Sequence, residues 1–344
     1  MNLELLRRLT AAPGVAGFER QVRAIVREEL APLIDEVRVD RLGNLIATKR
    51  GAGGPTVLIA AHMDEIGFLV RHVDERGFLR VQPLGSFDPR VLLAQRIIVH
   101  TATGNRVPGV IETIVDPLHF GPPNDLKRPD VRDLFVDVGS AVAEIEIGDM
   151  VTLDRDLYAT GDRVVSRALD DRLGLYVMIE AVRQMRDHKS TIVAVATAQE
   201  EVGSRGAVVA GYEIEPDICI ALDLTVANDI PGGSPDQEVT RLGNGPAIKV
   251  MDTTQISHPG LVRHLRDIAR ELDTPVQLEV LNHGGTDASL IQRLRAGVAV
   301  VTLSIPARYI HTVNETVAIG DVDRCVTLLA RYLEEAHTRR LEAE

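Results

Sequence analysis

The chain has 344 residues, of which 45% are hydrophobic and 26% are charged, a composition that excludes a disordered chain and fits about two globular domains. Its 38 Lys and Arg against 50 Asp and Glu give a net charge of −12, which argues against nucleic acid as a partner because such binding depends on basic residues that neutralise phosphates. The two cysteines are too few for a disulfide framework, and no apolar stretch reaches the roughly 18–20 residues that span a bilayer. With a charged N-terminus unlike a signal peptide, we expect a cytoplasmic protein without a membrane partner.

The predicted elements alternate between helices and short buried strands over most of the chain. Apolar residues at helical spacing predict four helices, over 17–30, 170–186, 258–272 and 321–338. Continuous apolar runs, which are typical of strands buried on both faces of a parallel sheet, lie at 57–61, 191–198, 218–222 and 298–305. We therefore predict an α/β fold with a mostly parallel central sheet flanked by helices.

The middle of the chain has a different pattern. From about 66 to 162 the apolar residues alternate over short stretches separated by turn residues, which predicts an inserted β-barrel domain. The α/β domain then consists of 1–65 plus 163–344. Within the insertion, the segment 116–130 is rich in Pro and charge and is predicted to be a mobile loop.

Polar residues follow each of the buried apolar runs. In open α/β sheets the functional crevice lies beyond the carboxyl ends of the strands, so these side chains should converge at one edge. Imidazoles together with carboxylates suit Zn or Co, and the surplus of carboxylates favours two metal ions that share a bridging acid and a bridging water. The candidates are His62, Asp64, Glu200, Glu201, Asp223 and His311, with Asp170 and Asp171 at the start of a predicted helix.

Each candidate also has a structural alternative when it is considered alone. Asp170 can be a helix N-cap, Glu200 and Glu201 solvated surface acids, Asp223 a turn residue and His311 a core histidine. We favour a shared site because all of them would otherwise fall at one sheet edge by accident. Residues two apart in a strand share a face, so Asp64 can lie beside His62 and orient its ring.

With these residues in place, the sequence resembles metallopeptidase family 42, the tetrahedral aminopeptidases, also labelled glutamyl aminopeptidase and historically endoglucanase M. The resemblance covers essentially the whole chain. It is carried, in the family's order, by LTAAPGVAGFERQVR near the start, DRLGNLIA at 40–47, AAHMDEIGFLV at 60–70, DLFVDVG at 133–139, RALDDRLG at 167–174, ATAQEEVGSRGA at 196–207, ALDLT at 221–225, GGTDAS at 284–289 and YIHTVNE at 309–315.

The resemblance implies a role for each candidate residue. Two divalent metal ions per subunit, Zn or Co, are expected, with Asp170 bridging them and the peptide bond between Asp170 and Asp171 in the cis form. Glu200 is the implied general acid and base, and Asp64 supports a ligand. The implied metal ligands are His62, Asp170, Glu201, Asp223 and His311. The implied fold is a zinc-exopeptidase-like α/β domain whose inserted barrel helps to build dimers and then a hollow dodecamer.

The function that we predict is a dinuclear-metal aminopeptidase that removes N-terminal residues from short peptides. A hydroxide bridging the metals would be the nucleophile, and Glu200 would generate it as general base. The preferred N-terminal residue is left open.

Three alternatives remain. A glycoside hydrolase fits the old family label, although the chain has no Trp for stacking against sugars. A metal-dependent deacylase or carboxypeptidase would act on a substrate carboxylate. A non-catalytic, metal-stabilised scaffold is disfavoured because it has no use for Glu200 and Asp64.

Two further features carry weaker hypotheses. The glycine-rich segment 283–287 precedes a helix-like run, so it either lines the substrate pocket or ends in a plain helix cap by Thr286. His119, on the predicted loop, is expected to be a solvated surface histidine.

Overall fold

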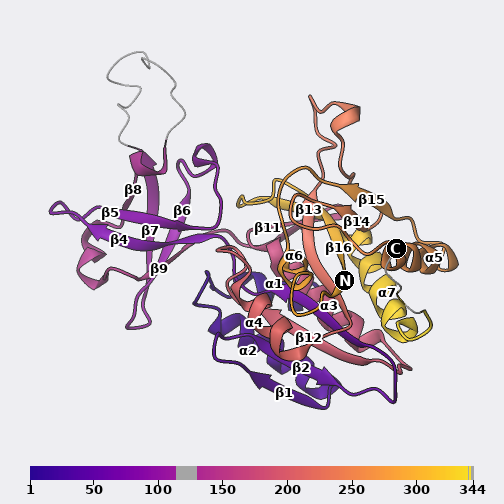
Figure 1. The fold of residues 1–344 in the computed structure, drawn as a ribbon. Helices are drawn as coiled ribbons and strands as arrows, with labels where there is room; N and C mark the ends of the chain where they lie inside the picture. The colour runs from indigo at the N-terminus through magenta and orange to yellow at the C-terminus, as the bar shows by residue number, and fades with distance from the viewer. Residues whose placement is uncertain (114–129, 340, 342–344) are drawn as a thin grey trace.

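The structure is a computed structural model that describes residues 1–113, 130–339 and 341. Figure 1 shows two parts, a barrel at one side and a larger α/β part that contains both ends of the chain. The predicted loop 116–130, with His119, lies outside the described residues except for Asp130.

The α/β part is built on one sheet of 11 strands. Its four central strands run parallel and correspond to the four apolar runs of the sequence: β12 (Thr191–Thr197), β3 (Thr56–His62), β13 (Ile218–Val226) and β16 (Ala299–Arg308). The predicted fold class is confirmed at this centre.

Antiparallel strands extend the parallel centre on both sides, so the sheet as a whole is mixed. They comprise β1 (Glu36–Val39) and β2 (Leu45–Lys49) on one side, and β17 (Glu315–Ala318), β11 (Arg163–Ser166) and β10 (Tyr158–Thr160) on the other. A parallel pair, β14 (Ala247–Met251) and β15 (Gln277–Val280), joins the sheet through antiparallel pairing of β14 with β16.

Helices cover both faces of this sheet. Alternate residues of β3 face opposite sides: Val57 and Ile59 belong to one apolar cluster, whereas Leu58 and Ala60 belong to another. The first cluster includes residues from α1 (Leu3–Ala11), α2 (Arg20–Leu30), α3 (Leu169–Gln184), α5 (Pro259–Glu271) and α7 (Ile319–Glu335). The second includes residues from α4 (Arg205–Ile214) and the short α6 (Asp287–Ile291). All four predicted helices are therefore confirmed.

The insertion contains a closed six-stranded barrel. Its strands all lie between Gly67 and Leu153, in the spatial order β4 (Gly67–Val73), β5 (Leu79–Leu84), β8 (Leu134–Asp137), β7 (Arg106–Thr113), β6 (Arg96–His100) and β9 (Met150–Leu153). Closure leaves no unpaired sheet edge, and alternate residues such as Leu79 and Val81 fill the interior. β10, within the same predicted range, pairs instead with β11 of the large sheet.

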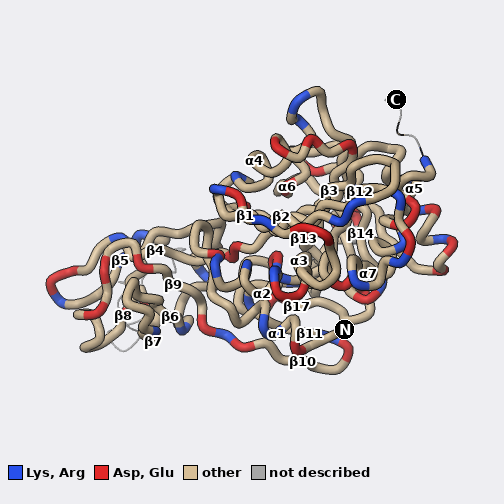
Figure 2. Tube along the Cα trace, turned by 90° about the horizontal axis from the view of Figure 1, so that it is seen from below, with Lys and Arg blue, Asp and Glu red and all other residues tan. Residues whose placement is uncertain are grey.

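Charged residues of both signs are scattered over both parts, as Figure 2 shows. Among the described residues, every helix is too short or too polar to cross a lipid bilayer.

Candidate active site

The predicted ligands meet at the carboxyl edge of the parallel strands. His62 is the last residue of β3, and Glu200 and Glu201 lie in the loop after β12. The apolar run had suggested that Asp223 follows its strand. Asp223 instead lies inside β13, because pairing with β16 continues as far as Val226. The apolar run marks the core-facing part of this strand, and hydrogen bonding continues beyond it.

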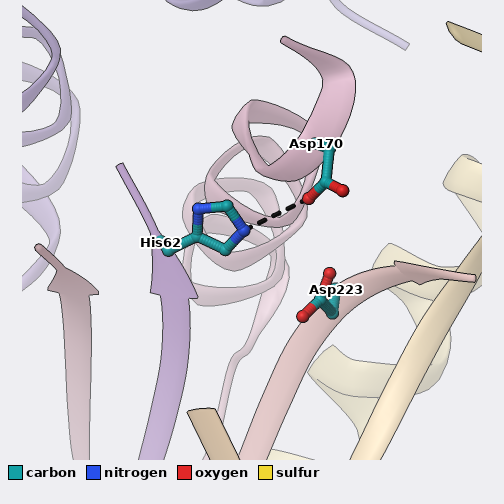
Figure 3. Close-up of side chains that lie close together, drawn as sticks. All are labelled: His62, Asp170 and Asp223. Atoms are coloured by element: carbon teal, nitrogen blue, oxygen red, sulfur yellow. Dashed lines mark hydrogen bonds and ion pairs between the residues drawn. The ribbon is translucent and has the colours of Figure 1, made fainter. Parts of the chain in front are cut away.

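The ligand candidates form two triads that share Asp170. His62, Asp170 and Asp223 form the first, in which the three side chains point into one space (Figure 3), and Asp170, Glu201 and His311 form the second. Within each triad, one ligand atom per residue lies within 4.8 Å of the others. Asp170 turns Oδ1 to His62 Nε2 at 3.1 Å and Oδ2 to His311 Nε2 at 3.5 Å. A carboxylate with its oxygens facing two ligand sets is suited to bridge two metal ions.

The electrostatics of the triads favour cations. Burial raises the pKa of Asp223 and Glu201 well above the usual range, and the nearby Asp170 raises both further. Burial would also raise the pKa of Asp170, but its hydrogen bonds to the two imidazoles hold it below the usual range. Burial alone would lower the pKa of each histidine, yet the surrounding carboxylates raise that of His62 strongly and that of His311 to about 10. A largely buried group of three carboxylates and two imidazoles can hold divalent metal ions.

Glu200 lies beside the triads without belonging to either. Its Oε1 accepts a hydrogen bond of 2.8 Å from Ser204 Oγ. Burial raises the pKa of Glu200 to about 7, with Asp287 and Asp64 raising it and His62 opposing the shift. A carboxyl group with a pKa near neutrality can both accept and return a proton.

Asp64 supports the site through two different groups. Its backbone carbonyl lies 2.9 Å from His62 Nδ1, whereas its carboxylate oxygen lies 3.6 Å from the same nitrogen. The carboxylate accepts the backbone N–H groups of Glu200 at 2.9 Å and Glu201 at 3.1 Å. The side chain therefore orients the acidic loop, and the main chain orients the imidazole.

Two buried carboxylates that the sequence did not single out as supports hold the ligand backbones. Glu315 accepts N–H groups from Asp170 at 3.1 Å and from His311 at 2.9 Å, and Asp171 accepts the N–H of His62 at 3.1 Å. The peptide bond between Asp170 and Asp171 is cis, as the resemblance implied. Glu315 was part of a resembling segment, but nothing in its spacing distinguishes it from an ordinary strand residue.

The backbone near the ligands adopts an uncommon conformation. Ala168, Gln199 and His311 have φ angles of 55°, 61° and 62°, in the left-handed region. This conformation costs a non-glycine residue about 1–3 kcal/mol and persists only where the surroundings hold it. For His311 the hydrogen bond to Glu315 does so.

Of the segment 283–287, the first three residues are exposed, and Thr286 and Asp287 are buried. The Thr286 side chain makes no capping hydrogen bond to α6, so the alternative of a plain helix cap is not met. Its hydroxyl instead forms a hydrogen bond of 3.0 Å with the hydroxyl of Thr302. Asp287 is 3% exposed and accepts a hydrogen bond from Thr197 Oγ1. The segment thus places a buried carboxylate near Glu200.

The chain is similar to known proteins over nearly its whole length. A family model described as M42 glutamyl aminopeptidase matches residues 43–328. The lysyl aminopeptidase of Pyrococcus furiosus is 38% identical over 344 residues, covering 97% of each chain. An aminopeptidase from Desulfurococcus kamchatkensis is 37% identical, with a TM-score of 0.94 over 99% of this chain and 97% of that one. The Pyrococcus horikoshii TET1 peptidase, which assembles into a tetrahedron or a large octahedral shell, is 31% identical, with a TM-score of 0.86 over 97% of this chain and 99% of that one.

Proposed function

Because the chain belongs to the M42 family of aminopeptidases, we propose that it is a dinuclear-metal enzyme that removes N-terminal residues from short peptides. The observation that carries the proposal is the pair of triads that share Asp170. Because the family consists of enzymes, its match to this chain argues against the non-catalytic scaffold.

Each of the two triads would hold one divalent metal ion, Zn or Co. His62 and Asp223 would hold one ion and Glu201 and His311 the other, with Asp170 between them. When bound, such ions lower the pKa of a water molecule and polarise a carbonyl oxygen.

The protein's own residues would move the proton. Glu200 takes a proton from the attacking water, which adds its oxygen to the scissile carbonyl carbon. When the C–N bond breaks, Glu200 returns that proton to the leaving amine. The bonds from Ser204 and to Asp64 support this role because they fix the Glu200 side chain and backbone. The carboxylates around the site would attract the substrate's positively charged α-ammonium group, which favours cleavage at the N-terminus.

A panel of aminoacyl chromogenic substrates tests the proposal. The panel should include glutamyl and lysyl substrates, each paired with its N-acetylated form. The matching family is described as glutamyl aminopeptidase, and one relative is a lysyl aminopeptidase. We expect hydrolysis of the free-amine substrates only, loss of activity on chelation, and recovery with added Zn²⁺ or Co²⁺.

Two results would overturn the proposal. Equal cleavage of the N-acetylated substrates would favour a deacylase or an endopeptidase. Hydrolysis of glucan that survives chelation, without peptidase activity, would favour the glycoside hydrolase.

We further propose that the chain forms a homo-oligomer in which dimers assemble into a dodecamer. The support is the likeness to TET1 and the presence of a separate barrel that is not needed to complete either triad. Light scattering of the purified protein tests this, and a monomeric mass would contradict it. Cys219 and Cys325 are both buried and unpaired, which agrees with a reducing compartment such as the cytoplasm.

A further inference from the structure

The loop that carries Glu200 is held by side chains from the first part of the chain. Asn44 is fully buried, and its Oδ1 accepts the N–H of Ala198 at 2.9 Å while its Nδ2 donates to the carbonyl of Gly206 at 3.0 Å. These two bonds fix the beginning and the end of the loop 198–206. Between them, the N–H groups of Gly203 and Ser204 donate to the carbonyl of Glu200.

Glu19 supplies a further contact in the middle of this loop. Glu19 is 3% exposed, and its Oε1 accepts the N–H of Gln199 at 3.1 Å and that of Gly17 at 2.7 Å. Although Glu19 occupies the N-cap position of α2, its side chain makes no capping hydrogen bond to that helix. The carboxylate therefore serves the loop rather than the helix.

The contact falls next to the proposed general base. Gln199 directly precedes Glu200 and has a left-handed backbone with φ 61°, so rotation of this residue would redirect the Glu200 side chain. Asp64 accepts the following two N–H groups. Two buried carboxylates thus hold three consecutive N–H groups, of residues 199, 200 and 201.

We propose that Glu19 is a positioning residue that holds Gln199, and through it Glu200, in the orientation needed for proton transfer. The inference rests on the proposed function of Glu200. Among the described residues, the hydrogen bonds of the Glu19 side chain go to Gly17 and Gln199 and not to the five ligand candidates, so its removal should change turnover rather than metal content.

Two substitutions separate positioning from simple stability. Glu19→Gln keeps an oxygen that accepts the Gln199 N–H, whereas Glu19→Met has a similar volume and no such acceptor. We expect Glu19→Met to lower kcat by about 10–100-fold, as a small misplacement of a catalytic group does, with KM within about threefold and full metal content. Glu19→Gln should restore kcat to within about threefold of the original protein. If Glu19→Met does not fold, Glu19→Ala leaves room for water at the Gln199 N–H and takes its place.

Asp321 provides a matched control. It is fully buried, accepts two backbone N–H groups, from Gly243 at 2.7 Å and Gly245 at 2.8 Å, and pairs with Arg324, and all three partners lie outside the loop 198–206. Asp321→Ala should lower the melting temperature without lowering kcat at a temperature where it is folded. Unchanged kcat in the folded Glu19→Met or Glu19→Ala enzyme, or an equal fall in Asp321→Ala, would overturn the inference. An original protein inactive across the substrate panel would instead show that the proposed function has failed.

Discussion

The barrel and the carboxyl edge of the large sheet bury opposite kinds of side chain. The barrel interior is aliphatic and aromatic, with Phe68, Leu79 and Val136 all at 0% exposure. The sheet edge instead buries His62 together with several carboxylates, while His311 is partly exposed. The barrel is therefore stabilised mainly by its apolar contacts, whereas the carboxylates of the sheet edge rely on backbone N–H groups and, under the proposed function, on metal ions.

The junction of the two regions resembles neither of them. Glu65, just before the first barrel strand, forms ion pairs with Arg167 and Arg172. Arg172 is fully buried and donates to the carbonyls of Leu9 and Ala12 at 2.7 and 2.9 Å. A buried pair of this kind costs desolvation but is strongly destabilising to break, so it ties the base of the barrel to α1 and α3.

The largest expected effect is at the bridging residue. Asp170→Ala should remove both metal ions and all measurable turnover, because Asp170 belongs to both triads. Asp223→Ala should weaken one ion and leave the other in place, because Asp223 belongs to only one. Elemental analysis after dialysis measures the two stoichiometries, and equal metal loss in both variants would contradict the shared-ligand geometry.

Glu200→Gln should reduce kcat by about 10²–10⁴-fold, the contribution usual for a general acid and base. Metal content should stay at that of the original protein because Glu200 lies outside both triads. The amide can still accept the hydrogen bond from Ser204, so the loop should keep its position. Turnover close to normal in this variant would refute the general-base assignment.

A core substitution tests whether the barrel is independent of the metals. Leu79→Ala should lower the free energy of unfolding by about 2–5 kcal/mol, the cost usual for a buried Leu, without changing the metal content of the folded protein. Leu303, equally buried in β16, is the matched control in the α/β part.

Chelation should lower the unfolding temperature of the α/β part more than that of the barrel, as followed by hydrogen exchange. Equal shifts in the two parts would mean that they unfold together.

The smallest effect is a pH dependence of metal uptake. In chelated protein the pKa of His311 is raised from 6.5 to about 10, so its protonated form stabilises the fold below pH 6.5, and this contribution is lost as pH rises through about 10. A metal ion must displace that proton. Apparent affinity should therefore rise by up to tenfold per pH unit for each proton released in this window. Calorimetry in buffers of different ionisation enthalpy counts the protons, and uptake without proton release would contradict the raised pKa.

Much of the architecture was predictable from local pattern. Each of the four central strands carries a continuous apolar run because both of its faces are covered by helices. The shorter, half-exposed barrel strands alternate because only one face is buried. The sequence pattern also predicted that polar residues follow these strands, and it placed His62 and the pair Glu200 and Glu201 at the correct edge.

The supports of the ligands were not predictable in this way. Glu19 and Gln199 are separated by 180 residues, and Glu315 and Asp170 by 145. Asp223 was expected after its strand because its polarity ended the apolar run, although the backbone pairing continues.

The sequence by itself determined the α/β class, the inserted barrel and the candidate ligands, because burial on one or two faces leaves a periodic pattern and because the motifs of the family are contiguous. Only the tertiary structure decided which side chains hold the backbone of the site, namely Glu19, Asp64 and Glu315. Those contacts join single side chains to distant N–H groups, and a single contact of this kind has no period in the sequence.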